Sequence, residues 1–423
     1  MRNMKDSGIE WIGEIPVGWE IIPNKRIMRK VKNVCEKYNG EDVLSLTMNG
    51  VIKRDLDNPS GKMPLSFDGY QYIKAGNLLM CLFDIDVTPR CIGVVENDGV
   101  TSPAYSQFEL NKNAHLKYYY YYYLNLDYSK QLLHLAKNLR HSLTESQLGE
   151  ILTPIPPYKE QHRISTYLDT KCEKIDSIIA RQQEVIEKLK TYKLSVITEA
   201  VTKGLNPDVR MKDSGVEWIG DVPEHWEITK FKYLSLEIGD GIHTTPEYDL
   251  AGSIYFINGN NIGFDNLVFK DNTDTINEDE YKKYKPSLLT TDTILITLNG
   301  ATYGKTSFYN SEKVLLGKSA GYITLKPTEN KRFLRYYLQS NAAKLIMEIS
   351  LLGSTIANLS LNTLKNFSMS YPPKNEQCEI VEYLDKKCSA IDSAIAKKQA
   401  IIEKLTAYKK SLIYEVVTGK REV

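Results

Sequence analysis

The chain has 423 residues, of which 42% are hydrophobic and 25% charged, and its formal net charge at pH 7 is +1. This composition excludes wholesale disorder and is typical of a globular protein with two or three domains. No apolar run reaches the roughly 18 residues that a membrane helix needs, and the N-terminal residues lack the apolar core of a signal peptide, so we expect a cytoplasmic protein without membrane contact. The six cysteines form no Cys-x-x-Cys pair, which argues against a disulfide framework or a structural zinc site.

Two segments of the sequence return in the same order. Residues 4–20 match residues 211–227 at 12 of 17 positions, and residues 156–204 match residues 372–420 at 27 of 49 positions. The period is far longer than that of a solenoid repeat. The chain is therefore interpreted as a tandem duplication in which similar frames surround two divergent modules.

The two unlike segments inside these frames, 21–155 and 228–371, alternate strand-like runs with turns and end in helix-like sequence. The clearest strand-like runs are 43–46, 78–83, 254–257 and 293–298, and the helix-like stretches are 116–139 and 332–352. The predicted fold class is α+β, with two globular modules of mixed helix and strand.

The longer repeat predicts two long helices. Residues 160–201 contain neither proline nor glycine, and apolar residues recur at alternating spacings of four and three. Because one such helix cannot bury its stripe alone, we expect the two to pack antiparallel as a coiled coil, giving an internal pseudo-twofold repeat. The predicted seam, which also offers a partner-binding surface, consists of Ile175, Ile179, Ile186, Leu189, Ile391, Ile395, Ile402 and Leu405.

These features divide the chain into four parts. Residues 1–155 form the first module and residues 156–204 the first long helix. Residues 205–371 form a linker and the second module, and residues 372–423 form the second long helix with a C-terminal tail.

Two catalytic motifs are approached but not completed. Residues 155–158 resemble the Asp/Asn-Pro-Pro-Tyr element of adenine methyltransferases, but Ile155 supplies no hydrogen-bond acceptor. Residues 300–306 resemble a phosphate-binding loop whose glycines are one residue too close. The histidines show no metal-ligand spacing. We therefore expect no catalytic residue, metal ion or cofactor in this chain.

Two local features each allow two interpretations. The six consecutive tyrosines at 118–123 favour a helix with a buried face over a platform for stacking bases. The basic cluster at 25–32 is either a solvated face or a set of phosphate contacts.

The ordered motifs together resemble the specificity subunit of a type I restriction–modification system over essentially the whole chain. The opening Trp11-Ile12-Gly13, Pro16 and Trp19 returns as Trp218-Ile219-Gly220, Pro223 and Trp226, and Pro-Pro-x-x-Glu-Gln begins both long helices at 156–161 and 372–377. Residues 240–248 and 102–105 are similar to sequences seen in target-recognition domains.

This resemblance implies a non-catalytic DNA-recognition subunit of a bacterial defence system. Each module would be a target-recognition domain that reads one half of an asymmetric, split site in double-stranded DNA. The paired helices would set the gap between the halves and dock two modification (methyltransferase) subunits. Restriction subunits would add ATP-dependent translocation and cleavage. The alternatives are a coiled-coil tether without DNA specificity and a stand-alone DNA methyltransferase or nuclease.

Candidate base-reading residues are polar side chains in predicted loops. Asn pairs with adenine, Arg and Lys with guanine, and Ser or Thr with either. In the first module they are Asn49, Lys53, Arg54, Arg90 and Ser102. In the second they are His243, Thr244, Thr245, Asn260, Asn261, Lys305, Lys318 and Ser319.

Overall fold

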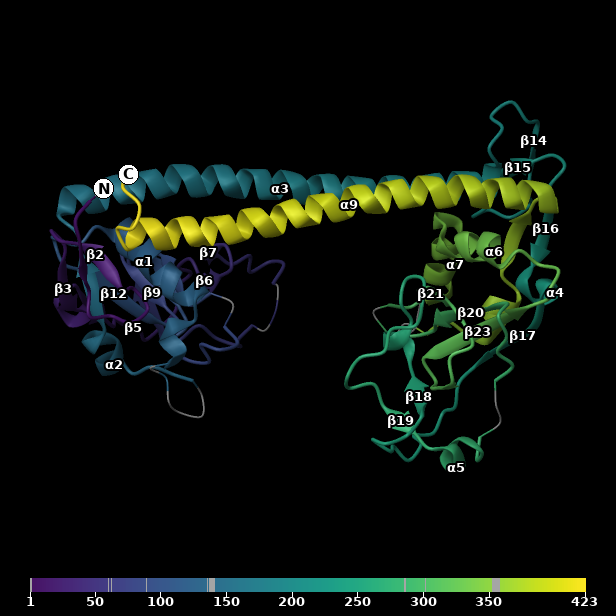
Figure 1. Ribbon diagram of the computed structural model, residues 1–423, viewed down its shortest axis with the longest axis horizontal. Coiled ribbons are helices and arrows are strands. Elements are labelled where there is room, and N and C mark those ends of the chain that lie inside the picture. The colour runs from purple at the N-terminus through teal and green to yellow at the C-terminus, as the bar shows by residue number, and fades with distance from the viewer. Residues whose placement is uncertain are drawn as a thin grey trace. The chain divides into compact units, whose positions relative to one another are not determined.

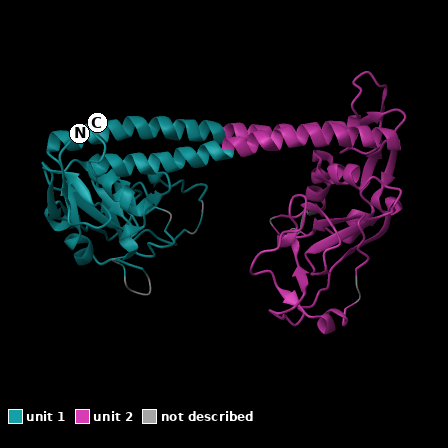
Figure 2. Cartoon of the chain, viewed as in Figure 1, with its two compact units in different colours: residues 1–183, 399–423 teal, residues 184–398 magenta. Residues whose placement is uncertain are grey.

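The computed structural model describes residues 2–59, 61, 63–88, 90–134, 136, 141–284, 287–300, 302–351 and 358–423. The chain divides into two compact units, coloured separately in Figure 2. Unit 1 comprises residues 1–183 and 399–423, and unit 2 comprises residues 184–398. The long helices α3 (Tyr158–Lys203) and α9 (Lys374–Val417) therefore contribute to both units.

The described part of unit 1 is built on a four-stranded sheet, in the order β10-β9-β12-β4, and a three-stranded sheet, in the order β11-β8-β5. Three antiparallel two-stranded pairs, β1-β2, β3-β13 and β6-β7, complete its strands. Figure 1 shows the strands of this unit. These strands are β1 (Met4–Asp6), β2 (Glu14–Pro16), β3 (Glu20–Pro23), β4 (Met28–Val31), β5 (Val34–Cys35), β6 (Leu44–Thr47), β7 (Gly50–Lys53), β8 (Tyr70–Ile73), β9 (Leu78–Met80), β10 (Ile92–Val94), β11 (Gly99–Thr101), β12 (Ser106–Leu110) and β13 (Leu152–Ile155).

The tyrosine run lies in helix α1 (Leu116–Tyr128), which forms the centre of the unit 1 core. All but Tyr120 of its six rings are buried, and three of their hydroxyls bond to distant parts of the unit. Tyr118 donates to the Val417 carbonyl at 3.0 Å and Tyr121 to Asp169 at 2.8 Å. The helix interpretation is thus confirmed, and burial of the rings excludes a base-stacking role.

The helix predicted at 116–139 ends earlier than expected. After α1, Lys130 adopts φ +51°, which interrupts the helix, and a short 3-10 turn follows at Gln131–His134. The capped helix α2 (Glu145–Glu150) precedes β13. Residues 135 and 137–139 lie outside the described part of the chain.

Unit 2 repeats this plan within its described residues. A four-stranded sheet has the order β17-β23-β20-β21, a three-stranded sheet has the order β19-β18-β22, and two pairs, β14-β15 and β16-β24, complete it. These strands are β14 (Met211–Asp213), β15 (Asp221–Pro223), β16 (Glu227–Lys230), β17 (Ser235–Asp240), β18 (Ile254–Ile257), β19 (Thr275–Ile276), β20 (Thr293–Thr297), β21 (Thr306–Phe308), β22 (Val314–Leu316), β23 (Ala320–Leu325) and β24 (Ser368–Tyr371).

The helical sequence predicted at 332–352 forms two helices rather than one. Helix α6 (Lys331–Gln339) ends where Ser340 adopts an extended conformation, and α7 (Asn341–Leu351) follows it; residue 352 is not among those described. The short helices α4 (Phe231–Leu234), α5 (Glu278–Tyr281) and α8 (Leu361–Lys365) lie nearer the sheets.

Helix α6 carries a buried arginine. The guanidinium of Arg335 lies 4.6 Å from the centre of the Phe308 ring and 5.6 Å from that of Phe264. Its Nη1 pairs with Asp265 at 2.8 Å, but Nε and Nη2 have no hydrogen-bond partner among the described atoms.

Equivalent contacts hold each module to the long helix that follows it. In unit 1 the indole N–H of the fully buried Trp19 donates to Glu160 at 3.1 Å. In unit 2 the indole N–H of the fully buried Trp226 donates to Glu376 at 2.9 Å. Trp and Glu thus occupy matching positions of the sequence repeats.

Each unit also takes part of its core from the C-terminal half of the other repeat's helix. The end of α9 supplies Leu412 and Val416 to the core of unit 1, and the end of α3 supplies Val196 and Ala200 to the core of unit 2. Helix α3 ends at Lys203, and the residue after it, Gly204, has a φ of +77°, the left-handed conformation in which glycine commonly ends a helix.

The predicted seam residues lie on the less exposed side of α3 and α9. Ile175, Ile186, Ile391 and Ile402 are buried, whereas Ile179, Leu189, Ile395 and Leu405 are half-buried. In unit 1, Ile175, Ile179 and Leu405 belong to one hydrophobic cluster. Among the described helices, none is both long and apolar enough to span a membrane.

Candidate nucleic-acid interface

In unit 1 the predicted base-reading residues gather on the β6-β7 hairpin. Met48 and Asn49 form its two-residue loop, and Gly50 follows with φ +96°, a conformation that favours glycine. Both loop side chains are exposed, Met48 by 57%. Lys53, at the end of β7, pairs with Asp42 at 2.6 Å. The hairpin thus presents one amide and one thioether to solvent at its tip.

The remaining candidates of unit 1 lie around this hairpin. Ser102 follows β11, which is held beside β6 by a 2.7 Å bond from the Thr101 hydroxyl to the Leu44 carbonyl. Arg54 is half-buried after β7. Arg90 precedes β10, and its Nε is buried without a partner among the residues described. The hairpin therefore carries Asn49 at its tip and Lys53, followed by Arg54, at its base. Ser102 follows the strand that lies beside this base, and Arg90 lies outside the hairpin.

In unit 2 the candidates gather where strands of both sheets end. The loop 243–245 follows an isolated bridge between Ile242 and Gly317. Lys318 and Ser319 form the β22-β23 turn, and the Ser319 hydroxyl accepts from the Gly259 N–H at 2.8 Å. Because Gly259 begins the 3-10 turn Gly259–Asn261 after β18, the loop 243–245, the Asn turn and the β22-β23 turn are neighbours. We call these three segments the recognition edge of unit 2.

Two of the candidates at this edge already use their polar groups to build it. Asn261 accepts from the Asn258 N–H at 3.0 Å and donates to the Val268 carbonyl at 3.1 Å. Ser319 also donates to the Asn258 carboxamide at 3.0 Å. These side chains shape the turn, and a base contact from either would compete with those bonds.

The other candidates of unit 2 differ in exposure. Thr244, Thr245, Asn260 and Lys318 are exposed. His243 is exposed and lies 2.8 Å from Asp240, measured from Nε2 to Oδ2. The half-buried Lys305 lies apart, between β20 and β21, where it lines a cavity. It is the lysine of the incomplete phosphate-loop motif, whose residue 301 is outside the described set.

A buried carboxylate anchors the loop that carries Thr244 and Thr245. Glu280 accepts from Lys283, from the Glu247 N–H at 3.1 Å and from the Tyr284 hydroxyl at 2.8 Å. The hydrogen bond from Lys283, followed by the other two, lowers the pKa of Glu280 below its usual value. The ionised carboxylate therefore fixes the base of the loop.

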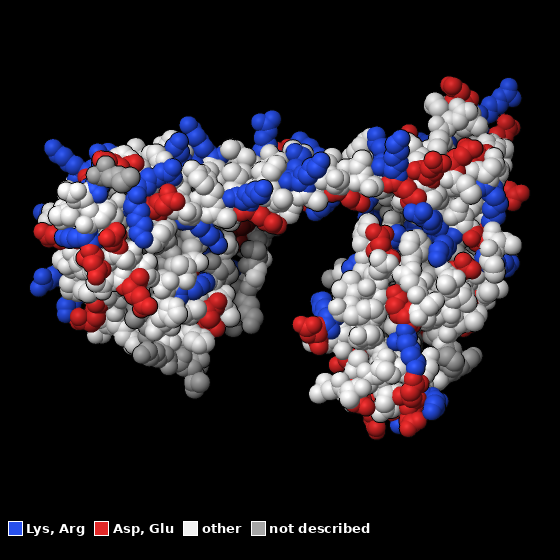
Figure 3. Space-filling view, in the orientation of Figure 1, with Lys and Arg blue, Asp and Glu red and all other residues white. Residues whose placement is uncertain are grey.

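Positive charge is not concentrated on the visible face of either unit, where Lys and Arg are interspersed with Asp and Glu (Figure 3). The basic cluster at 25–32 follows this pattern, because Lys25 pairs with Glu150 at 2.7 Å and Arg29 with Glu109 at 2.6 Å. This pairing favours the solvated-face interpretation of the cluster.

Sequence reasoning missed two residues at these surfaces. Asn258 holds the Asn turn against Ser319 in unit 2, and the Asn-Gly dipeptide that it opens is a turn signal. Met48 stands at the hairpin tip of unit 1 beside Asn49. An apolar side chain at a two-residue loop was the available signal there.

Comparison with known proteins gives a family match in two segments. Residues 91–188 and 239–406 match the model of the Type I restriction modification DNA specificity domain. Over 433 aligned residues the chain is 24% identical to the putative type I restriction enzyme MjaX specificity subunit of Methanocaldococcus jannaschii, covering 97% of this chain and 96% of that protein. It is 26% identical to the MjaVIII specificity subunit of the same organism, where the match spans 63% of that subunit and 64% of this chain.

A solved structure shares the fold. The chain superposes on a chain from a study of complex assembly and conformational transition of the type I R-M system, with a TM-score of 0.70 and 14% sequence identity. The match covers 96% of this chain and 99% of that one.

Proposed function

Because the family match covers more than half of its length, the chain belongs to the family of the type I restriction–modification DNA specificity domain, and we propose that it selects the DNA site for a complex that modifies and restricts DNA. The resemblance inferred from the repeated motifs is confirmed at this level. The proposal extends it to a bipartite, asymmetric target in double-stranded DNA, read by modules 1–155 and 205–371.

The observation that carries the proposal is the contrast between the repeated frames and the different surfaces that they support. The Trp19–Glu160 and Trp226–Glu376 hydrogen bonds are the same in both units. The surfaces that the frames support differ: a hairpin with an exposed Met-Asn tip in unit 1, and three adjoining loops in unit 2. An asymmetric split target requires two different DNA-contacting surfaces, and here equivalent Trp–Glu contacts hold two such surfaces.

Ion pairs between the long helices support antiparallel pairing. In unit 1, Asp176 of α3 pairs with Lys409 of α9, and in unit 2, Lys193 of α3 pairs with Asp392 of α9, with the shorter N···O distance 2.6 Å in each case. From the first pair to the second, the residue number increases along α3 and decreases along α9, as it does in antiparallel helices. The two pairs also occupy equivalent positions of the repeat, in agreement with a pseudo-twofold relation.

The helices offer matching surfaces for partner subunits. Tyr192 on α3 and Tyr408 on α9 occupy equivalent positions of the repeat and are 48% and 49% exposed. Exposed tyrosines are common in protein interfaces, because they combine a large apolar ring with a hydroxyl. We assign these two faces to the docking of two modification subunits, with restriction subunits joining the assembled complex.

The test is a genome-wide map of modified adenines in cells that carry the gene with its modification partner. A split, asymmetric motif that disappears with the gene is the expected result. Thr245→Ala should change only one half of that motif, and Asn49→Ala only the other. Thr291→Ala is the matched control, because this exposed threonine precedes β20 at the end away from the recognition edge.

Two outcomes would favour other functions. Unchanged modification after deletion, with the partner expressed, would favour a tether without DNA specificity. Methylation or cleavage by the purified chain alone would favour a stand-alone enzyme.

A further inference from the structure

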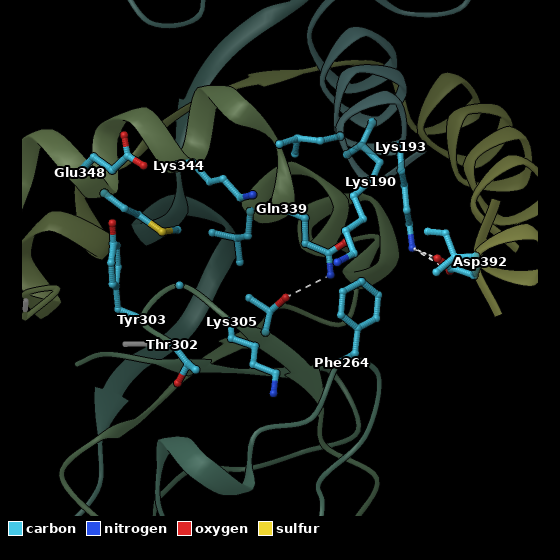
Figure 4. A pocket seen from close by; sticks show the side chains of 17 residues that line it. Lys190, Lys193, Phe264, Thr302, Tyr303, Lys305, Gln339, Lys344, Glu348 and Asp392 are labelled. Carbon is cyan, nitrogen blue, oxygen red and sulfur yellow. Dashed lines mark hydrogen bonds and ion pairs between the residues drawn. The ribbon is translucent and has the colours of Figure 1, made fainter. Parts of the chain in front are cut away.

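Unit 2 contains a cavity that the DNA-recognition proposal does not use. Its volume is about 710 Å³, within the range of roughly 300–1,000 Å³ typical of small-molecule sites. Figure 4 shows it between the C-terminal half of α3, the loop 302–306 and helices α6 and α7. Its apolar lining includes Leu194, Ile197, Leu338, Met347 and Ile395.

Two lysine side chains give this apolar cavity a cationic rim. In Figure 4, Lys190 and Lys344 extend toward the space around Gln339. Lys190 has one exposed ion pair, with Glu187 at 2.8 Å, and such pairs contribute little. Lys344 is exposed, and its ammonium group has no hydrogen bond or ion pair within the described part of the chain. Both ammonium groups are therefore available to an anion.

An aromatic ring stands at the edge of the cavity. Phe264 is 56% exposed, and the Lys193 amine lies 4.7 Å from its ring centre. That amine is held by Asp392 at 2.6 Å and 2.7 Å, so it is already neutralised. The Arg335 guanidinium also lies 5.6 Å from the centre of this ring, and the 56% of Phe264 that is exposed is the part that a planar group can contact.

The other repeat does not keep these features. At the positions equivalent to Lys190 and Leu194, α9 carries Thr406 and Lys410. The Lys410 amine lies 5.2 Å from the ring centre of Tyr128 in unit 1. Packing of the duplicated helix therefore requires neither a lysine at the position of Lys190 nor an apolar residue at the position of Leu194. The apolar, lysine-rimmed wall is a property of unit 2.

An apolar cavity, a planar stacking surface and two ammonium groups together suit one class of ligand. Ammonium groups bind phosphate oxygens through charge-assisted hydrogen bonds, and a planar heterocycle stacks on an exposed phenyl ring. We propose that this cavity binds an aromatic phosphate ester of the nucleoside diphosphate class, with its base against Phe264 and its phosphates near Lys190 and Lys344. The site is separate from the recognition edge of unit 2, and of the candidate base-reading residues Lys305 lines it.

The test uses the full chain and metal-free ADP, with binding measured by calorimetry. Saturable binding of one ADP per chain is expected. Lys344→Glu and Lys190→Glu should each weaken it about tenfold or more, since each replaces a favourable charge with a repulsive one. Lys188→Glu is the matched control, because Lys188 is exposed on α3, as Lys190 is, but does not line the cavity.

Further measurements test the location and chemistry of the site. Leu194→Trp should abolish binding by filling the cavity, and bound ADP should slow hydrogen exchange in residues 338–348. Circular dichroism checks that each variant is folded. Absence of saturable ADP binding, equal losses in Lys344→Glu and Lys188→Glu, or inorganic pyrophosphate competing as well as ADP would each overturn the proposal.

Discussion

Trp226 allows the frame contact of unit 2 to be measured with a control in the same repeat element. Its buried indole N–H donates to Glu376 at 2.9 Å. Trp218 lies eight positions earlier, and its buried Nε1 has no hydrogen-bond partner in the described structure. The substitutions Trp226→Phe and Trp218→Phe remove the same atoms, but only the first removes a bond to a carboxylate.

The expected loss of stability follows from two contributions. A hydrogen bond to a charged group contributes about 1.5–3 kcal/mol. Replacing indole by phenyl in a closed core adds about 1 kcal/mol for the space left behind. Trp226→Phe should therefore destabilise unit 2 by about 2.5–4 kcal/mol. Trp218→Phe should cost about 1 kcal/mol or less, because it also removes an unsatisfied buried donor.

Hydrogen exchange followed by mass spectrometry is the suitable assay, because it reports the stability of each unit in a chain that need not unfold in one step. Peptides from β16 and the start of α9 should exchange faster in Trp226→Phe, with unit 1 unchanged. Equal effects of the two substitutions would refute the assignment of the frame's stability to the Trp226–Glu376 bond.

Three further predictions address charge and docking. Burial, together with a second imidazole nearby, lowers the pKa of His115 below 6.5, so the unfolded chain binds this proton more readily. The contribution of neutral His115 to the stability of unit 1 should thus be fully present above pH 6.5 and be lost as the pH falls below it. Hydrogen exchange should show a weaker pH dependence of this stability in His115→Gln. An unchanged slope would contradict the assignment. Arg335→Met should change the unfolding free energy of unit 2 by no more than about 1 kcal/mol, because Asp265 is 64% exposed and stays solvated; a loss above about 3 kcal/mol in denaturant titration would show that the pair is essential. Tyr192→Ala and Tyr408→Ala should each weaken co-purification with a modification subunit while circular dichroism stays unchanged, and full retention in the double variant would place docking elsewhere.

The long helices could be predicted from the sequence because their signal is local. A run of 42 residues without proline or glycine, with apolar residues spaced for one face, defines α3 within a few residues of its ends. The contacts that anchor it are not local. Trp19 and Glu160 are 141 positions apart, and Tyr118 and Val417 are 299 apart. Periodicity within one segment carries no information about such pairs.

The recognition surfaces were predictable as loops but not as individual contacts. The Asn-Gly at residues 49–50 specifies a tight hairpin, and that hairpin is present. The sequence does not distinguish an Asn261 or Ser319 side chain that closes a turn from one that faces a base. In the structure, both side chains close the turn. Sequence therefore indicates where polar groups gather, whereas their hydrogen-bond partners decide which remain available.

The exchange of helix ends between repeats has a consequence for how the protein is made. Unit 2 is one continuous stretch, residues 184–398, so all of its core is synthesised before residues 399–423 are added. Unit 1 needs residues 399–423 as well, and Tyr118 bonds to the carbonyl of Val417. The N-terminal module must therefore wait, with part of its apolar core uncovered, until residues 399–417 have been synthesised. The order of folding should run against the order of translation, and a chaperone that shields unit 1 during this interval should raise the yield of the native protein.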